Sequence, residues 1–358
     1  MENNLRSRTN KVKIKDKILG GSNQVLIQTM SKTKTSLIDE NIALCDDLYK
    51  RGCDLLRLSV LDEEDAKALS YIVDQSKMPI IADIHFSKNL AIKAIESGVA
   101  KIRINPGNMK KDDLKEVIHV AKIYNVAIRI GINSGCLDTY REKDPKAMNS
   151  YFSLLDQTIN IFKENDYDQN LVLALKSTDP ELTYNLYRSA ANIYKYPLHL
   201  GVTETGYGIM GMARTCSALV PLLKEGIGNT IRITLTDSPQ EEVEACKSLL
   251  TSLGLRNEFP TLISCPTCGR TKVDVSLLVR KVQDLIAHTR GDFKVAIMGC
   301  PVNGPGEAKN ADIGLAGLND SFMIFEKGEK GPILKEEEAF TYLKKKIAIL
   351  SKRSHIVK

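Results

Sequence analysis

Three cysteines in the C-terminal part of the chain are spaced like ligands of a metal centre. Cys265 and Cys268 form a C-x-x-C pair in "CPTCGR", and Cys300 follows in "GCPVNGPGE". A structural zinc site needs a fourth Cys or His, but there is no second C-x-x-C, and His288 and His355 lack ligand spacing. A dithiol redox pair would leave Cys300 unexplained. An iron–sulfur cluster fits best, because Cys265 and Cys300 each precede a proline, as cluster ligands often do.

The fourth ligand is predicted to be a carboxylate, which is an unusual ligand for an iron–sulfur cluster. Glu307 lies seven residues after Cys300, beyond "PVNGPG", whose glycines and proline allow the chain to turn back. A carboxylate is a hard ligand that exchanges more readily than a thiolate, so one iron would stay open to a substrate oxygen. The alternative is that Glu307 is an ordinary loop acid.

A second set of polar side chains lies at the ends of short apolar segments in the N-terminal part of the chain. Seven such segments carry charged or amide residues where a buried strand would carry Val or Ile. Cations outnumber acids five to two, and Arg side chains bind phosphate oxygens in a bidentate manner. We therefore expect a phosphorylated small molecule to bind there. The residues are Arg57, Asp83, Arg103, Asn105, Arg129, Asn133, Lys176, Thr203, Glu204, Arg232 and Thr234.

The apolar segments alternate with amphipathic helical patterns, and this alternation predicts an α/β fold of the TIM (β/α)8 barrel type. Alternating strands and helices form parallel β-α-β units, and eight units in about 230 residues match the size of a TIM barrel. A doubly wound sheet is the alternative. Active sites of TIM barrels lie at the carboxyl ends of the strands, where these polar residues fall. The predicted strands cover residues 25–30, 55–60, 79–85, 101–107, 126–133, 171–177, 198–205 and 230–236.

The segment "GYGIMG" has the glycine spacing of a dinucleotide-binding loop, with Gly206, Gly208 and Gly211. However, it follows the seventh predicted strand, whereas the dinucleotide motif follows the first strand of a Rossmann unit. The next strand also ends in Thr236 where that motif requires an acid. We therefore interpret the segment as a phosphate-binding loop of the barrel.

A smaller α+β domain that carries the cysteines is predicted after the barrel. Its expected elements are a helix at 276–290, a strand at 293–299, a hairpin at 311–328 that turns at Asn319-Asp320, and a helix at 336–350. The predicted organisation is a TIM barrel over residues 1–256, a linker over 257–264 and a cluster domain over 265–358.

The composition is that of a globular protein with two domains. The chain has 358 residues, of which 43% are hydrophobic and 26% charged, and its formal net charge is +6. Much of this charge lies near the termini, which favours a solvated surface over nucleic-acid binding. We expect a cytoplasmic protein with no membrane association, because neither a signal peptide nor an apolar run of about 20 residues is present.

Several motifs resemble those of the 4-hydroxy-3-methylbut-2-enyl diphosphate synthase family, an iron–sulfur enzyme family of non-mevalonate isoprenoid biosynthesis. They include "IADIHF", "IRINPGN", "RIGINSG", "ISCPTCGRT" and "VAIMGCPVNGPGEAKNADIGLAG". The resemblance covers roughly residues 25–335 and is to the short bacterial type, since the large insert of the plant enzymes is absent. Cys136 and Thr234 stand where serine is more usual in the family, and Thr234 keeps the hydroxyl group.

This resemblance implies a reaction, a cofactor and roles for particular residues. The substrate 2-C-methyl-D-erythritol 2,4-cyclodiphosphate would be opened and dehydrated with two electrons from reduced flavodoxin or ferredoxin. A [4Fe-4S] cluster would be bound by Cys265, Cys268, Cys300 and Glu307. Asp83 and Glu204 would handle protons, with Glu204 nearest the departing hydroxyl. The substrate would be held by Arg57, Arg103, Arg129, Asn133, Lys176, Arg232 and Thr234.

The predicted path of the chain favours a head-to-tail homodimer. The last barrel helix runs antiparallel to its strand, so the chain leaves the barrel at the end opposite the active site. The linker over 257–264 reaches at most about 26 Å, whereas a barrel with its helices is roughly 40 Å across. We expect the cluster domain of one chain to cap the barrel of another under two-fold symmetry, and the family resemblance implies the same dimer.

A competing prediction is a phosphate-substrate barrel enzyme of the aldolase or pterin-synthase type. Its C-terminal domain would then be a zinc-stabilised binding module, for example for RNA. Iron and sulfide in equal amounts in a brown protein would favour the cluster, whereas stoichiometric zinc in a colourless active protein would favour this alternative.

Overall fold

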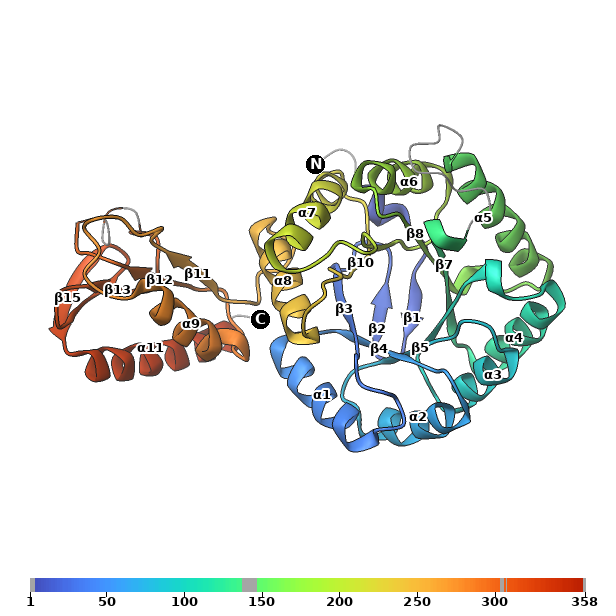
Figure 1. The fold of residues 1–358 in the computed structure, drawn as a ribbon, viewed down its shortest axis with the longest axis horizontal. Helices are drawn as coiled ribbons and strands as arrows, with labels where there is room; N and C mark the ends of the chain where they lie inside the picture. Colours follow the sequence, from blue (N-terminus) through green and yellow to red (C-terminus); the bar gives the residue numbers. More distant parts are fainter. Residues whose placement is uncertain (1–3, 137–146, 303–305, 307, 357–358) are drawn as a thin grey trace. The chain divides into compact units, whose positions relative to one another are not determined.

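A ring of parallel strands surrounded by helices forms the N-terminal part of the chain in the computed structural model (Figure 1). The structure describes residues 4–136, 147–302, 306 and 308–356. The strands of the ring are β3 (Leu26–Met30), β4 (Leu55–Ser59), β5 (Ile80–Asp83), β6 (Lys101–Ile104), β7 (Ala127–Asn133), β8 (Leu171–Lys176), β9 (His199–Leu200) and β10 (Thr230–Ile231). Their order is β8-β7-β6-β5-β4-β3-β10-β9, and a parallel bridge from Leu173 to Leu198 joins its two ends. The predicted TIM barrel is confirmed.

Each strand of the ring is followed by a helix on the outside of the barrel (Figure 1). Local signals in the sequence set the helix ends. The side chain of Asp62 accepts a hydrogen bond from the N–H of Asp65, and Gly52 ends the first helix in a left-handed conformation with φ 102°. The helices are α1 (Ile38–Arg51), α2 (Glu63–Gln75), α3 (Lys88–Glu96), α4 (Lys111–Tyr124), α5 (Ala147–Glu164), α6 (Pro180–Ile193), α7 (Gly208–Lys224) and α8 (Pro239–Ser252). Short 3-10 turns cover Leu5–Arg8, Pro106–Asn108, Ser134–Cys136 and Asp168–Asn170.

The last two strands of the barrel are much shorter than predicted. β9 and β10 contain two residues each, whereas the sequence predicted strands at 198–205 and 230–236. The chain leaves the sheet early at both places, so Glu204 and Thr234 lie in loops beyond the strand ends. The loops are tied together, because the Thr205 hydroxyl donates to the carbonyl oxygen of Thr234.

A hairpin that the sequence analysis missed covers the amino ends of the barrel strands. It consists of β1 (Val12–Ile14) and β2 (Lys17–Leu19), which lie across the centre of the ring in Figure 1. Its apolar side chains Val12, Ile14 and Leu19 are buried with residues from the beginnings of the barrel strands, among them Leu26, Leu55, Ile81, Ala127 and Val172. The hairpin therefore closes this end of the barrel with an apolar layer.

The chain divides into two units, Met1–Leu249 and Leu250–Lys358, and the second contains a five-stranded sheet. The first three strands of this sheet are parallel, and the last two pairs are antiparallel. The predicted hairpin that turns at Asn319-Asp320 is present as the second-last pair. In order across the sheet, the strands are β11 (Thr261–Ser264), β12 (Lys294–Met298), β13 (Ile313–Gly317), β14 (Phe322–Glu326) and β15 (Glu329–Leu334).

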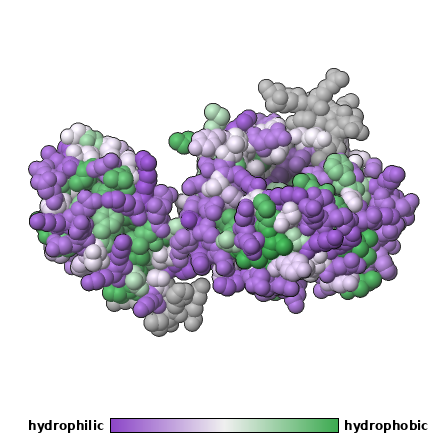
Figure 2. Space-filling view, turned by 60° about the horizontal axis from the view of Figure 1, so that its bottom comes forward, coloured by the Kyte–Doolittle hydropathy of each residue, from purple (hydrophilic) through white to green (hydrophobic). Residues whose placement is uncertain are grey.

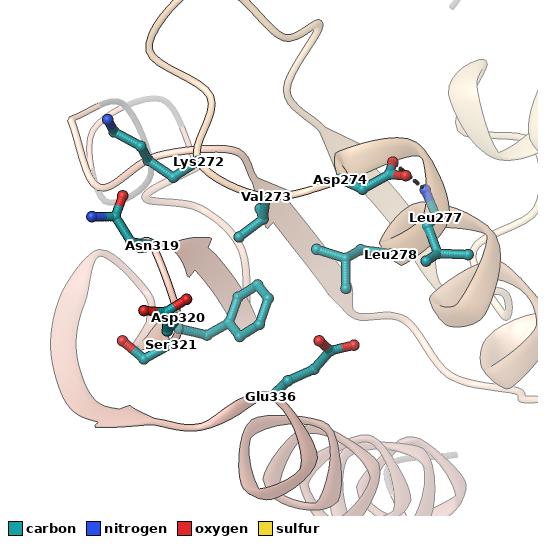
Figure 3. A pocket seen from close by; sticks show the side chains of 10 residues that line it. Lys272, Val273, Asp274, Leu277, Leu278, Asn319, Asp320, Ser321 and Glu336 are labelled. Atoms are coloured by element: carbon teal, nitrogen blue, oxygen red, sulfur yellow. Dashed lines mark hydrogen bonds between the residues drawn. The ribbon is translucent and has the colours of Figure 1, made fainter.

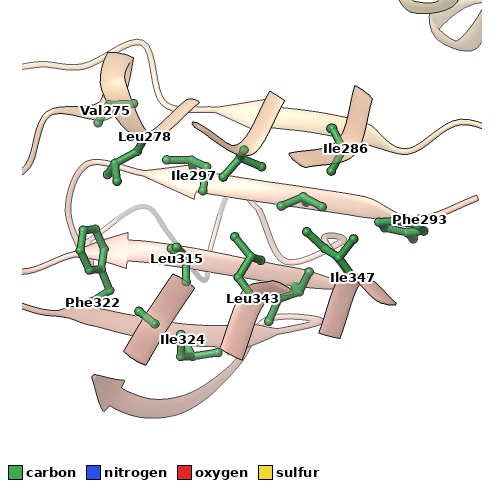
Figure 4. Packing of buried hydrophobic residues seen from close by; sticks show 14 residues of the cluster. Val275, Leu278, Ile286, Phe293, Ile297, Leu315, Phe322, Ile324, Leu343 and Ile347 are labelled. Carbon is green, nitrogen blue, oxygen red and sulfur yellow. The ribbon is translucent and has the colours of Figure 1, made fainter. Parts of the chain in front are cut away.

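The core of the second unit lies between the sheet and two helices, α9 (Val275–Ala287) and α11 (Glu336–Ile356) (Figure 4). Alternate residues of the central strands point into this core, for example Val295 and Ile297 of β12. The remaining residues of β12, such as Ala296 and Met298, belong to a second apolar cluster with Ala308 and Ala311. Ala308 and Ala311, which follow β12 in the chain, therefore pack against this face of the sheet.

The segment expected as a linker, residues 257–264, begins the fold of the second unit. Its last four residues form β11, which pairs in parallel with β12. Phe259 is buried, and the guanidinium carbons of Arg256 and Arg290 lie 5.2 and 4.7 Å from the centre of its ring. These cation–π contacts attach the segment to the second unit.

The surface is largely hydrophilic on the face seen in Figure 2, with scattered hydrophobic patches. In the described part of the chain, no helix combines the length and the apolar character that crossing a bilayer requires.

Candidate functional site

The structure brings together all five cations that the sequence predicted at the barrel mouth. The mouth consists of the carboxyl ends of the barrel strands and the loops that follow them. Arg103 and Arg129 are neighbours on β6 and β7, and Lys176 ends β8. Lys176 is buried, and its pKa lies well below the ordinary value, first because of burial and then because Arg129, Arg232, Arg57 and Arg103 repel its charge. Burial and neighbouring cations also lower the pKa of Arg57, to about 10.

Asp83 holds two of these arginines. Its carboxylate lies 3.2 Å from Nη1 of Arg103 and 3.6 Å from Nε of Arg57. Burial alone would raise the pKa of Asp83, but Arg57, a hydrogen bond with His85 and Arg103 together lower it well below its usual range. Asp83 is therefore ionised at neutral pH and fixes the positions of Arg57 and Arg103.

Glu242 of α8 is a second acid at the mouth, and the sequence analysis missed it. Its side chain is fully buried and accepts hydrogen bonds from Nε and Nη2 of Arg232, at 3.1 and 3.2 Å. A signal was present in the sequence, because Glu242 lies four residues before Cys246 and eight before Leu250, on the buried side of the helix. An acid on that side of a helix needs a buried partner.

Two glycines leave room for the buried cations. A Cβ atom on Gly131 would lie 2.9 Å from Nε of Arg103. A Cβ atom on Gly201 would lie 2.5 Å from Nζ of Lys176 and 2.9 Å from the carbonyl oxygen of Arg232. Any larger residue at either position would displace a cation of the mouth.

Three further predicted polar residues, Asn133, Thr234 and Glu204, lie at the rim of the mouth. Asn133 is half-buried at the end of β7, where it is paired in register with Lys176. Thr234 is half-buried just after β10. Glu204 is exposed in the loop after β9, and its backbone has a φ of 53°, a left-handed conformation that is uncommon for residues other than glycine. Strained backbone of this kind is concentrated at functional sites.

A polar layer that the sequence analysis did not identify lies between the mouth and the apolar layer at the hairpin. Among the described residues, Nζ of Lys101, Nε2 of His199 and both side-chain polar atoms of Gln28 are buried without a hydrogen-bond partner. Nδ1 of His199 lies 2.6 Å from the Thr230 hydroxyl. The pKa of Lys101 lies well below the ordinary lysine value because of burial and then because of Arg129 and Arg57.

The three predicted cysteine ligands lie near the carboxyl ends of β11 and β12. These two strands are parallel neighbours, so Cys265 directly after β11 and Cys300 two residues after β12 reach the same edge of the sheet. The N–H of Cys265 donates to the carbonyl oxygen of Ile297 at 3.0 Å, and the N–H of Cys268 donates to the Thr271 hydroxyl at 3.0 Å. All three thiols are free; Cys268 is exposed and Cys300 buried.

Arg270 is a cation that interacts with all three of these thiols. Hydrogen bonds from its backbone and its side chain lower the pKa of Cys268, and its own pKa is raised by Cys268, Cys300 and Cys265 in turn. Within the described residues, no three His, Cys, Asp or Glu side chains are arranged to hold a single metal ion. Cysteine ligands of a cubane cluster bind separate iron atoms, so cluster ligands need not converge on a single ion. Glu307, the predicted fourth ligand and catalytic residue, lies outside the described residues.

A pocket of about 360 Å³ lies in the second unit between the start of α9, the β13–β14 turn and the start of α11 (Figure 3). Its lining includes Lys272, Asp274, Asp320 and Glu336. Asp274 caps α9 by accepting from the N–H of Leu277 at 2.9 Å, and Glu336 lies 3.0 Å from Nζ of Lys281. Asp274 and Glu336 therefore have structural roles, one as a helix cap and the other in an ion pair.

Among solved structures, dihydropteroate synthases share the barrel. The enzyme from Stenotrophomonas maltophilia has a TM-score of 0.52 and 14% sequence identity, and the match covers 69% of this chain and 98% of that one. The Xanthomonas albilineans enzyme gives a TM-score of 0.51 and 12% identity over similar shares, 69% and 98%. At these identities the likeness concerns the fold alone.

Two family models match the chain in succession. The GcpE TIM-barrel domain matches residues 9–247, and the GcpE protein C-terminal domain matches residues 261–349. A relative from Malacoplasma penetrans, named 4-hydroxy-3-methylbut-2-en-1-yl diphosphate synthase (flavodoxin), is 44% identical over 98% of this chain and 97% of its own. A relative of the same name from Bacillus mycoides is 39% identical over 97% and 95%. The family resemblance that the motifs indicated is confirmed, and the chain belongs to the GcpE family.

Proposed function

We propose that this protein converts 2-C-methyl-D-erythritol 2,4-cyclodiphosphate to (E)-4-hydroxy-3-methylbut-2-enyl diphosphate, using two electrons delivered through a [4Fe-4S] cluster. Relatives that match this chain over nearly their full lengths carry the name of this synthase. The structural observation that carries the proposal is the combination, on one chain, of a mouth with five cations and a sheet edge with three free thiols. A cyclic diphosphate needs the first, and an iron–sulfur cluster needs the second.

The cations of the mouth are proposed to bind the two phosphates. Arg57, Arg103 and Arg232 have acid partners that fix their orientation, whereas Arg129 and Lys176 form no ion pair with a described acid. Nε and Nη2 of Arg129 are buried without a hydrogen-bond partner among the described residues. A phosphate oxygen would supply that partner and would also relieve the repulsion that lowers the Lys176 pKa. Asn133 and Thr234 would donate further hydrogen bonds from the rim.

Glu204 is proposed as the residue that transfers a proton to the departing hydroxyl group. It is exposed at the mouth, and its left-handed backbone fixes where its side chain begins. The expected proton transfer by Asp83 finds less support, because Asp83 is ionised and already paired with two arginines. We therefore assign Asp83 mainly to the orientation of Arg57 and Arg103.

Cys265, Cys268, Cys300 and Glu307 are proposed as ligands of the [4Fe-4S] cluster. The lowered pKa of the Cys268 thiol agrees with this proposal, because a ligand must be deprotonated. When bound, the cluster would supply electrons and a Lewis-acidic iron. Arg270, beside all three thiols, would compensate part of their negative charge.

The proposed partners are an electron carrier and a second copy of the chain. The printed names of the relatives support reduced flavodoxin as the electron donor, with ferredoxin as the alternative. A head-to-tail homodimer is supported by large exposed apolar side chains in the loops after β5 and β9 and at the start of α7, for example Phe86, Tyr207 and Ile209. Such side chains are typical of surfaces that a partner covers. A cytoplasmic location is part of the same proposal.

Anaerobic purification followed by an activity assay tests the proposed function. We expect a brown protein with equimolar iron and sulfide that turns over the cyclodiphosphate with reduced flavodoxin. A colourless protein that is fully active with stoichiometric zinc would overturn the proposal in favour of the phosphate-substrate barrel enzyme with a structural zinc domain.

A further inference from the structure

We propose that Glu242 is a positioning residue that fixes the guanidinium group of Arg232 for a phosphate of the substrate. This inference rests on the proposed function, because it takes Arg232 to contact that phosphate. It assigns a role to a helix residue that lies outside the strand ends and loops in which the predicted site residues were found.

The Glu242 carboxylate is bound by donors from strand β3 and from the segment that follows β10. One oxygen accepts from the Thr29 hydroxyl of β3 at 2.6 Å and from Nε of Arg232 at 3.1 Å. The other accepts from Nη2 of Arg232 at 3.2 Å and from the N–H of Leu235 at 3.1 Å. The side chain is fully buried. Rotation of this carboxylate would break hydrogen bonds of both oxygens at once, with no water to replace them.

These contacts fix one edge of the Arg232 guanidinium and leave the other edge available. Nε and Nη2 face Glu242, whereas Nη1 lies 3.7 Å from the thioether sulfur of Met30, a weak acceptor. Arg232 therefore presents its Nη1 edge to the mouth in one orientation. A side chain with four rotatable bonds would otherwise lose that freedom only when the substrate binds.

Charge and geometry predict opposite effects of removing the Glu242 charge. The mouth is already rich in cations, so Glu242→Gln would raise its positive charge and, by charge alone, strengthen phosphate binding. By geometry, the same change weakens binding. A glutamine amide turns one oxygen into an NH2 group, which would face donors whichever way it is placed, so Arg232 loses at least part of its bidentate contact. The sign of the effect on substrate affinity separates the two accounts.

The test is a double-mutant cycle on Glu242→Gln and Arg232→Met, with KM and kcat measured for the cyclodiphosphate and reduced flavodoxin. We expect KM to rise about tenfold for Glu242→Gln and further for Arg232→Met. The double variant should match Arg232→Met alone, because Glu242 acts through Arg232. Glu244→Gln is the matched control: it removes an acid from the same helix turn, paired with Lys247 and Arg51, and should leave KM unchanged.

Several results would overturn the inference. They are an unchanged or lower KM for Glu242→Gln, independent effects of the two changes in the double variant, or an equal effect of Glu244→Gln. If Glu242→Gln does not fold, Glu242→Asp takes its place in the cycle, since it keeps the buried charge and shortens the reach. If the wild-type protein has no such turnover, the proposed function fails. The dissociation constant of inorganic pyrophosphate, measured by calorimetry for the same variants, then replaces KM in the cycle. If the effects of Glu242→Gln and Arg232→Met on that constant are independent, the inference about Glu242 is overturned as well.

Discussion

The barrel mouth and the cysteine edge of the second unit are organised in different ways. At the mouth, buried acids hold the cations: Asp83 fixes Arg57 and Arg103, and Glu242 fixes Arg232. At the cysteine edge, Cys265 and Cys268 are held by hydrogen bonds of their backbone N–H groups. Cys268 is the most exposed of the three cysteines. The cations of the mouth are therefore oriented mainly by ion pairs that exist before any anion binds, whereas under the proposed function the three thiols would be organised by the cluster that they bind.

Removing one thiol should have the largest effect. Cys268→Ser should abolish cluster incorporation and lower turnover about a hundredfold or more, because an exposed hydroxyl is a poor iron ligand. The binding of pyrophosphate to the barrel should stay unchanged. Iron and sulfide analysis and the absorbance at roughly 400 nm measure the cluster content. Calorimetry measures pyrophosphate binding. Cys216→Ser, on the barrel helix α7, is the control, and a full complement of iron in Cys268→Ser would contradict the ligand role.

Subunit mixing tests whether the mouth and the cysteine edge of different chains work together. A Glu204→Gln chain and a Cys268→Ser chain, each inactive alone, should recover about a quarter of wild-type activity after random exchange. Half of the dimers would then be mixed, and one of the two sites in each would combine intact domains. No recovery, although mixed dimers are demonstrated by mass spectrometry, would mean that each chain works alone.

Removing one unpaired cation from the mouth should have a smaller effect, confined to substrate binding. Arg129→Ala should weaken substrate binding by about 1.5–3 kcal/mol, roughly a 10- to 150-fold rise in KM, because a charge-assisted phosphate contact is lost. The cluster spectrum should not change. Arg188→Ala, which removes an exposed arginine paired with Glu225, is the matched control. If KM stays the same in Arg129→Ala, the phosphates bind elsewhere.

The smallest effect is expected beneath the mouth, where Lys101 has no described partner. Lys101→Met should raise the free energy of unfolding by on the order of 1 kcal/mol, because a buried unpaired amine is replaced by an apolar side chain. The folded-state pKa of Lys101 is lowered, so the unfolded chain binds more protons, and wild-type stability falls as pH decreases below the ordinary lysine value.

The variant should therefore gain more over the wild type near pH 6 than near pH 9, as measured by thermal unfolding of the barrel. Lys67→Met, on the exposed side of α2, provides the control without burial. A stability difference that does not depend on pH would show that Lys101 keeps an ordinary pKa.

Much of the fold could be predicted from the sequence because its signals are local. The alternation of apolar strands with amphipathic helices identified the barrel, and the position of residues such as Arg103 and Lys176 at strand ends identified the mouth. The Asn319-Asp320 turn identified the hairpin of the second unit.

The parts that could not be predicted depend on contacts between distant residues. Glu242 was missed because its partners, Thr29 and Arg232, become visible only once the barrel closes. β15 was missed because its residues are mostly exposed and include a glycine and a proline, so the strand depends on pairing with β14 more than on its own apolar pattern. The strand β11 was not predicted for a similar reason, since it is held by β12.

The hairpin at the amino end of the barrel has a kinetic consequence. Val12, Ile14 and Leu19 seal that end with an apolar layer, so small polar molecules must enter and leave the barrel at the mouth. Substrate, product and released water would then all pass through the mouth. A bound product must depart before the next substrate can enter, and we expect the product diphosphate to inhibit competitively against the cyclic substrate.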